Sequence, residues 1–260
     1  MPRTTILVAL LLMASATQAQ PQPTQVGTLE SVKDCELRYR VHAPATGLTN
    51  PAIVIAHGFM RTGEFMTGWA EAIERAGLTA VTVDMCAAFA PAGRHADNGT
   101  DLVALRRALG IESVVYIGVS AGGLAALIAA SLDREATRGV LLLDPTNAGG
   151  QSRRAAARID APVAALVARP QICNAWRNID PALQTLRDAT IVRIERASHC
   201  DFEWPTDAFC RVACVSMNGD ERQRRAQDRI RDVGLAFIEA LRSDAPDALA
   251  RWKASIGDAP

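Results

Sequence analysis

Short apolar runs alternate with longer amphipathic stretches along almost the whole chain. Short runs rich in β-branched residues are typical of buried strands, and the stretches with one apolar face are typical of helices. The predicted elements are a hairpin of strands 27–32 and 35–43, strand 52–57, helix 63–76, strand 79–84, helix 99–109, strand 113–118, helix 121–132, strand 139–143, strand 162–168, a helix near 180–188, strand 190–196 and helix 221–242. This alternation predicts an α/β fold with an eight-stranded, mostly parallel sheet and helices on both faces.

The first residues have the composition of an export signal. Arg3 precedes the apolar run 6–13, and small residues follow up to position 19. The apolar run is too short to span a bilayer. We expect cleavage after Ala19, with Ala16 as the alternative, and an exported protein, periplasmic or extracellular, without stable membrane insertion. No repeat, linker or low-complexity tract divides residues 20–260, which are expected to form a single domain.

The charge of the exported part is nearly balanced. The chain has 28 basic and 28 acidic residues, and removal of residues 1–19 takes away only Arg3. A near-neutral protein gives no electrostatic reason to expect nucleic acid as a partner. We expect a monomer. The six cysteines include no C-x-x-C pair, so a zinc or redox motif is disfavoured, and neither a metal nor a cofactor is expected.

An even number of cysteines in an oxidising compartment predicts up to three disulfides. The cysteines are Cys35, Cys86, Cys173, Cys200, Cys210 and Cys214.

The segment YIGVSAGG, residues 116–123, places one serine between two glycines where a predicted strand passes into a predicted helix. Gly118 and Gly122 allow the backbone to turn sharply at Ser120 and the strand to pack closely on the helix. In this context the G-x-S-x-G pattern predicts a nucleophile elbow with Ser120 as the nucleophile. The alternative is a glycine-rich turn that only packs, or one that binds an anion at a helix N-terminus.

Among the four histidines, His199 is the candidate general base. It follows the last predicted strand, and the loops at the carboxyl ends of parallel strands converge on one site. His42 lies on the opening hairpin and is expected at the surface. His95 lies in a loop that follows no strand, and His57 is expected to have a structural role.

The backbone is expected to supply the oxyanion donors. Strand 52–57 leads into a loop in which the amide of Phe59 is one donor, and the amide of Ala121, directly after the nucleophile, is the other. An ordinary strand-end turn is the alternative for this loop. Met60 and Trp176 are expected to bind the substrate, because neighbouring loops carry them.

The acid that orients His199 has three candidates. The usual chain order is serine, acid, histidine, which favours Asp144 at the end of the strand after the elbow. Strand 162–168 is the commoner place for the acid, but no carboxylate follows it before Asp180. Asp201 is only two residues from His199 and would have difficulty reaching the back of its ring. Asp180 and Asp201 remain the alternatives.

Together these residues resemble the α/β-hydrolase superfamily over residues 28–242. Within it, the chain is similar to the cap-less chlorophyllase-like enzymes and related secreted serine esterases. The segments that carry the resemblance are HGF at 57–59, GVSAGG at 118–123, LLLDP at 141–145, CNAWRN at 173–178 and SHCDF at 198–202. In chlorophyllase-like enzymes the acid belongs to the Asp-Pro pair, which implies Asp144. Those enzymes carry His and Arg inside the elbow where this chain has Val119 and Ala121, so the resemblance implies ester hydrolysis without implying chlorophyll as the substrate.

The resemblance also implies the surroundings of the site and one disulfide. A cap domain would be inserted after strand 139–143, where the short segment 145–161 has room for one turn of helix, so no large cap domain and an open site are expected. The second strand of this superfamily runs antiparallel beside strand 79–84, which implies a Cys35–Cys86 disulfide.

The other four cysteines leave three possible pairings. A Cys210–Cys214 bond is disfavoured if that stretch is helical, since side chains four residues apart seldom meet disulfide geometry. One of the two is therefore expected to bond Cys200 and the other Cys173.

The predicted function is that of an exported serine hydrolase that cleaves small or polymeric carboxylic esters. Ser120, Asp144 and His199 would act through an acyl-enzyme intermediate. The alternatives are an amidase or acyltransferase with the same triad, or an inactive hydrolase-fold binding protein. The presence of all three triad residue types in order disfavours the inactive protein.

Overall fold

The computed structural model describes residues 24–33, 35–86, 94–214 and 221–257. The predicted export signal lies outside the described residues. Among those residues, no helix is long and apolar enough to cross a membrane.

The centre of the structure is an eight-stranded sheet with the strand order β1-β2-β4-β3-β5-β6-β7-β8. β2 runs antiparallel to both of its neighbours, and all other neighbouring pairs are parallel. The strands are β1 Gln25–Glu30, β2 Glu36–His42, β3 Ala52–Ala56, β4 Ala80–Asp84, β5 Val114–Val119, β6 Thr137–Leu143, β7 Val163–Val167 and β8 Ala189–Arg193. The predicted eight-stranded, mostly parallel sheet is confirmed.

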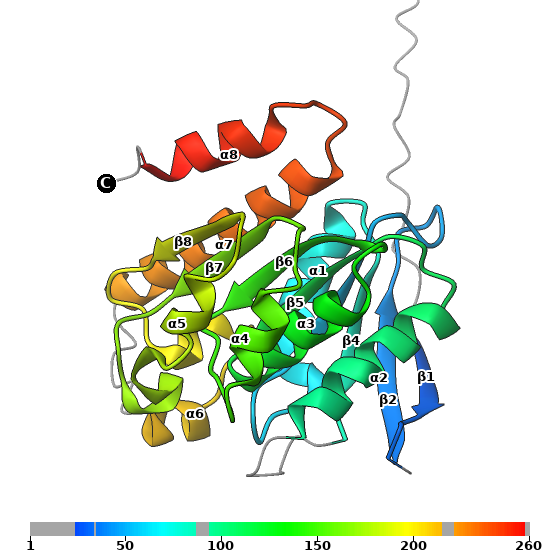
Figure 1. The fold of residues 1–260 in the computed structure, drawn as a ribbon, viewed down its shortest axis with the longest axis horizontal. Coiled ribbons are helices and arrows are strands. Elements are labelled where there is room, and N and C mark those ends of the chain that lie inside the picture. Colours follow the sequence, from blue (N-terminus) through cyan, green and yellow to red (C-terminus); the bar gives the residue numbers. More distant parts are fainter. Residues whose placement is uncertain (1–23, 34, 87–93, 215–220, 258–260) are drawn as a thin grey trace, which may run out of the picture.

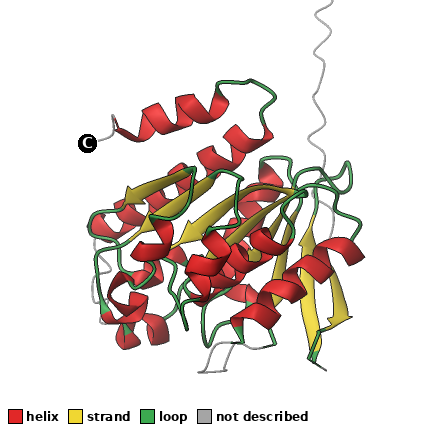
Figure 2. Cartoon of the chain, viewed as in Figure 1, coloured by secondary structure: helices red, strands yellow, loops and turns green. Residues whose placement is uncertain are grey.

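Helices cover both faces of this sheet (Figures 1 and 2). The α-helices are α1 Thr67–Arg75, α2 His95–Ala108, α3 Ala121–Leu132, α4 Gln151–Ala156, α5 Asp180–Leu183, α6 Ala208–Ala213, α7 Glu221–Arg242 and α8 Ala248–Gly257. Apolar side chains of α2, α3, α4 and α5 form one core with the sheet, and those of α1, α7 and α8 form a second core on the other face. The inner strands are apolar along their whole length because both faces are covered.

Three short 3₁₀ segments complete the loops at the carboxyl edge of the sheet. They are η1 Gly63–Met66, η2 Ile172–Arg177 and η3 His199–Phe202. Every residue between β6 and β7 is described, and that segment contains only the six-residue α4. The described part of the chain therefore has no large cap domain over this edge.

Several details differ from the sequence prediction. His42 was expected at the surface, but it is only 4% exposed, because β2 pairs on both sides and Glu74 of α1 lies over it, 3.9 Å from its Nδ1. His95 begins α2 and is buried. The helix near 180–188 ends at Leu183, and α8 was not predicted.

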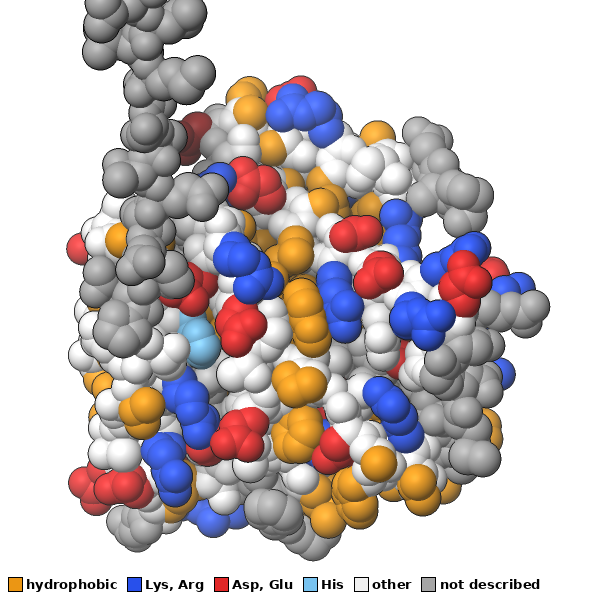
Figure 3. Space-filling model, turned by 180° about the vertical axis from the view of Figure 1, so that it is seen from behind, with side chains coloured by type: hydrophobic (Ala, Val, Ile, Leu, Met, Phe, Trp, Pro, Cys, Tyr) orange, Lys and Arg blue, Asp and Glu red, His pale blue; other side chains and the backbone are white. Residues whose placement is uncertain are grey.

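The structure contains three disulfides: Cys35–Cys86, Cys173–Cys214 and Cys200–Cys210. The Cys35–Cys86 bond is the one implied by the resemblance, and Cys210 and Cys214 bond Cys200 and Cys173 as expected, in the arrangement that the sequence left open. On the face of the molecule seen from behind, basic and acidic side chains are interspersed (Figure 3), in keeping with the balanced charge of the sequence.

Candidate active site

Ser120 lies at the sharp turn between β5 and α3. Its backbone has φ 55° and ψ −121°, which is a strained conformation for a residue with a side chain. Hydrogen bonds on both sides hold this conformation: the Ser120 amide donates to Leu143 O of β6 at 3.0 Å, and the Ser120 carbonyl accepts from Thr146 N at 3.1 Å. The neighbouring strand therefore fixes the backbone of the proposed nucleophile.

The two flanking glycines are required by close backbone contacts. A Cβ at position 118 would lie 2.1 Å from the Gly122 carbonyl oxygen, and a Cβ at position 122 would lie 2.3 Å from the His57 carbonyl oxygen. Neither contact is possible for a larger residue without moving the backbone. This is the physical basis of the G-x-S-x-G signal in the sequence.

His199 and Asp144 form a buried pair at the same edge of the sheet. His199 Nδ1 lies 2.7 Å from Asp144 Oδ2, and the two residues are 7% and 1% exposed. Asp144 follows β6 directly, and His199 begins η3 after β8. The imidazole is thus oriented with Nδ1 toward the carboxylate and Nε2 away from it.

Asp144 accepts hydrogen bonds from two further donors. The amide of Ala168 donates to Asp144 Oδ1 at 2.9 Å, and Asn174 Nδ2 lies 3.3 Å and 3.2 Å from Oδ1 and Oδ2. All of these partners are donors, which is the environment that an ionised carboxylate requires.

The other two candidate acids have different partners. Asp180 pairs with Arg177, Oδ1 to Nη2 at 2.8 Å. Asp201 accepts hydrogen bonds from Ser198 N at 2.7 Å and from Gln227 Nε2 at 3.0 Å. Of the three acids, only Asp144 is brought to the His199 ring.

The Ser120 hydroxyl and the His199 ring, both of which the structure describes, do not form a hydrogen bond with each other. In resting active sites this bond is commonly long and tightens only when substrate is bound. Ser120 is nevertheless tied to the same strand end as Asp144, because its amide binds the carbonyl of Leu143, the residue before Asp144.

The loop after β3 contacts the serine turn. A Cβ at position 58 would lie 3.3 Å from Ser120 Cβ. The backbone amide of Phe59 makes no hydrogen bond to any described residue, so it is free to donate to a ligand. Phe59 and Met60 are 43% and 45% exposed. This loop can therefore offer a backbone donor and apolar side chains next to Ser120.

His57 is buried and stabilises this loop. Its Nδ1 donates to the Gly58 carbonyl at 2.8 Å, and its Nε2 accepts from the Met85 amide at 2.9 Å, which corresponds to the neutral tautomer with the proton on Nδ1. Burial lowers the pKa of His57 to about 4. These contacts agree with the structural role expected from the sequence.

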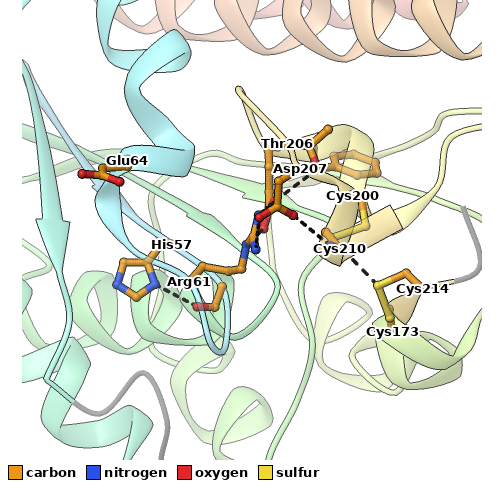
Figure 4. Close-up of polar contacts among 12 residues, drawn as sticks. His57, Arg61, Glu64, Cys173, Cys200, Thr206, Asp207, Cys210 and Cys214 are labelled. Atoms are coloured by element: carbon orange, nitrogen blue, oxygen red, sulfur yellow. Dashed lines mark hydrogen bonds and ion pairs between the residues drawn. A yellow bond between two sulfur atoms is a disulfide. The ribbon is translucent and has the colours of Figure 1, made fainter. Parts of the chain in front are cut away.

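An ion pair that was not predicted from the sequence joins this loop to the segment after η3. Arg61 binds Glu203 through two hydrogen bonds, Nε to Oε1 at 2.8 Å and Nη2 to Oε2 at 2.7 Å. Its Nη1 also lies 3.1 Å from Asp207 Oδ2 (Figure 4). Burial raises the pKa of Glu203, while Arg61 and then His199 act in the opposite direction. The pair links the Phe59 loop to the segment that carries His199.

Two of the disulfides lie in the same region. Cys200–Cys210 ties η3 to α6, and Cys173–Cys214 ties η2 to the end of α6 (Figure 4). Trp176 of η2 is 69% exposed. The segments that carry His199, Asn174 and Trp176 are therefore covalently connected through α6.

No protein-family model matches this sequence, and no curated protein matches it. Solved structures do match its fold. A dienelactone hydrolase from Anabaena variabilis ATCC 29413 is 21% identical, with 85% of this chain and 98% of that chain covered and a TM-score of 0.60. Est1E from Butyrivibrio proteoclasticus, solved with ferulic acid bound, is 13% identical over 81% of this chain and 98% of that chain, also with a TM-score of 0.60.

A thermophilic esterase from Thermogutta terrifontis is 14% identical, with 84% of this chain and 100% of that chain covered and a TM-score of 0.56. At these identities the likeness shows the fold, which is that of the α/β-hydrolases.

Proposed function

We propose that the protein is a serine hydrolase that cleaves carboxylic esters with Ser120 as nucleophile, His199 as general base and Asp144 as the orienting acid. The observation that carries the proposal is the buried contact of 2.7 Å between His199 Nδ1 and Asp144 Oδ2, at the same strand end that fixes the strained backbone of Ser120. Strain of this kind persists where the surroundings impose it, and it occurs at functional sites.

The proposed reaction has two steps through an acyl-enzyme. His199 Nε2 takes the proton of Ser120 Oγ as this oxygen attacks the ester carbonyl, and Asp144 stabilises the imidazolium that forms. The amides of Phe59 and Ala121 donate to the oxyanion. His199 then returns the proton to the leaving alcohol, and the same residue activates the water that releases the acid.

The open edge of the sheet supports small or polymeric esters as substrates. Exposed Phe59, Met60 and Trp176 offer apolar surface for an acyl chain. Ferulic acid, the ligand of Est1E, is a carboxylic acid of the kind that such a reaction would release. We also propose that the protein resembles the chlorophyllase-like enzymes within the superfamily and that it uses no cofactor or metal.

Export to the periplasm or the medium is also proposed. It is supported by the signal-like residues 1–19 and by three disulfides, which persist in oxidising compartments.

The proposal is tested by labelling with phenylmethylsulfonyl fluoride and by turnover of a p-nitrophenyl ester. Ser120→Ala and His199→Ala are each expected to lower kcat/KM by about 10³-fold or more, because the triad residues act as one unit. Ser131→Ala is the matched control, since Ser131 lies on α3 and its hydroxyl donates to the Ile128 carbonyl of the same helix. Retained turnover in Ser120→Ala, or labelling at another serine, would contradict the assignment.

The same assay separates the alternative functions. A p-nitroanilide with the same acyl group tests for an amidase, and an added alcohol acceptor tests for acyl transfer. A wild-type protein that is neither labelled nor active on any of these substrates would support a binding protein.

A further inference from the structure

We propose that Asn174 is a positioning residue whose side-chain amide holds the Asp144 carboxylate in the orientation that meets His199. The inference rests on the proposed function, since it assigns a fourth residue to the same site. The structural observation that supports it does not depend on a substrate: Asn174 is fully buried and donates toward both carboxylate oxygens of Asp144.

The orientation of the Asn174 amide is set by its other contacts. Its Oδ1 accepts from the backbone amides of Gln171 at 2.9 Å and Arg177 at 3.3 Å. Its Nδ2 donates to the Arg169 carbonyl at 2.8 Å as well as to Asp144. Because Oδ1 is occupied by two N–H donors, the NH₂ group must be the part that faces the carboxylate.

Asp144 needs such support because one backbone bond alone does not orient it. Ala168 N binds only Oδ1, while His199 Nδ1 contacts Oδ2. The amide of Asn174 spans both oxygens and so restricts rotation of the carboxylate about its Cβ–Cγ bond. Without Asn174, a fully buried carboxylate would lose one of its donors.

The backbone that follows Asn174 has a strained conformation, and this conformation lets the Asn174 side chain reach Asp144. Ala175, Trp176 and Arg177 have successive φ angles of 49°, 54° and 59°. The left-handed conformation is disfavoured for residues that have a side chain. The turn directs Asn174 into the protein while Trp176, two residues on, is 69% exposed. The asparagine hydrogen bonds and the Cys173–Cys214 disulfide hold the turn in this conformation.

Replacement by aspartate separates a positioning role from a packing role. Asn174→Asp keeps the size and the Oδ1 contacts but places a second carboxyl group against Asp144. Two carboxylates at this distance cannot both be ionised, so the pair shares a proton and titrates together.

Other charged groups around the site stay the same in this variant. Glu203, which acts on His199, remains paired with Arg61. Asp201 remains bonded to Ser198, and Arg177 remains paired with Asp180. A change in the pH profile can therefore be assigned to the substituted position.

The experiment compares kcat and KM against pH for the wild type, Asn174→Asp and Asn178→Asp. Asn178 is the matched control, because it lies in the same segment but, among the described residues, its amide binds only the Asn147 backbone. In Asn174→Asp we expect the acidic midpoint of kcat to rise by about one pH unit or more and the plateau of kcat to fall by about 10- to 100-fold, with KM little changed. In Asn178→Asp both are expected to stay at the wild-type values.

A second variant keeps the inference testable if Asn174→Asp does not fold. In Asn174→Ala, proton NMR should show that the downfield resonance of His199 Nδ1–H shifts or broadens while the remaining spectrum stays folded. An unchanged resonance in Asn174→Ala, or the same pH midpoint for both aspartate variants, would overturn the inference. An unlabelled and inactive wild type would instead contradict the proposed function, and the NMR comparison would still test the contact.

Discussion

Substitution of each of the three candidate acids tests whether Asp144 is the one that orients His199. Asp144→Asn would favour the wrong tautomer of His199, because the new amide can donate where the carboxylate accepted. We expect kcat to fall by roughly 10³- to 10⁴-fold. Asp180→Asn and Asp201→Asn, whose carboxylates bind Arg177 and Ser198, are expected to stay within about tenfold of the wild type. Turnover of one p-nitrophenyl ester by all three variants gives the ranking, and a reversed order would refute the assignment of Asp144.

His57 makes the fold sensitive to acid. Burial lowers its pKa from 6.5 in the unfolded chain to about 4 in the folded protein. Between these values the unfolded state binds more protons, so the free energy of unfolding falls as the pH drops from 6.5 toward 4, by up to about 3 kcal/mol. In His57→Gln, which keeps an acceptor for the Met85 amide, this slope should be smaller. Urea unfolding at several pH values measures it, and equal slopes would show that another group is responsible.

The residue-scale features that the sequence could reveal are the local ones. Ser120 was predictable because the two glycines that its turn requires lie two residues before and two residues after it in the sequence, even though Gly122 packs against the His57 carbonyl of another loop. Asn174 and the Arg61–Glu203 pair were not, since their partners lie 30 and 142 residues away and only the folded chain brings them together. His42 was misjudged for the same reason: its burial comes from α1 and from two neighbouring strands.

At the scale of elements, the disulfides divide into one at the sheet margin and two at the site. The chain-entropy treatment gives roughly 4 kcal/mol each for Cys35–Cys86 and Cys173–Cys214, which are 51 and 41 residues apart, and somewhat less than 3 kcal/mol for Cys200–Cys210, which are 10 residues apart. Cys173→Ser with Cys214→Ser should lower both the stability and the activity, because it frees the left-handed turn that carries Asn174. Cys35→Ser with Cys86→Ser should lower stability alone, since this bond joins the start of β2 to the end of β4. Thermal unfolding and kcat of the two double variants test this, and equal losses of activity would contradict it.

The long elements were predictable because their patterns are strong. The bounds of α3 and α7 match the sequence prediction. α8 was missed because tertiary contacts determine its position: Trp252 packs on Phe237 of α7, with ring centroids 4.7 Å apart, and its Nε1 donates to the Val233 carbonyl. The turn at η2 could not be predicted, because nothing in its sequence favours three consecutive left-handed residues with side chains.

At the scale of the whole molecule, the open edge of the sheet determines how the proposed esterase should meet its substrate. With only α4 between β6 and β7, the described structure has no lid that an oil–water surface would open. The rate on tributyrin should therefore rise smoothly as the substrate passes its solubility limit. A sharp increase at that limit would indicate a closing element over the site.

The architecture was predictable from the sequence, and part of its topology only through the resemblance. Alternating apolar and amphipathic segments indicate a parallel sheet with two covered faces, because both sides of such strands must be buried. The antiparallel position of β2 beside β4, on which the Cys35–Cys86 pairing rests, is not contained in that pattern. It required the known arrangement of the superfamily.

The six-residue α6 has a consequence for local opening. Phe209 and Val212 are 58% and 74% exposed, and the residue that α6 buries is Cys210. A helix of this length is not stable in isolation, so its place depends mainly on the two disulfides and on the contact of Asp207 with Arg61. When the disulfides are reduced, the backbone amides of α6 are expected to exchange with solvent as in an unstructured peptide, while the sheet stays protected. A reducing environment is thus expected to abolish the activity of the proposed site well before the protein unfolds.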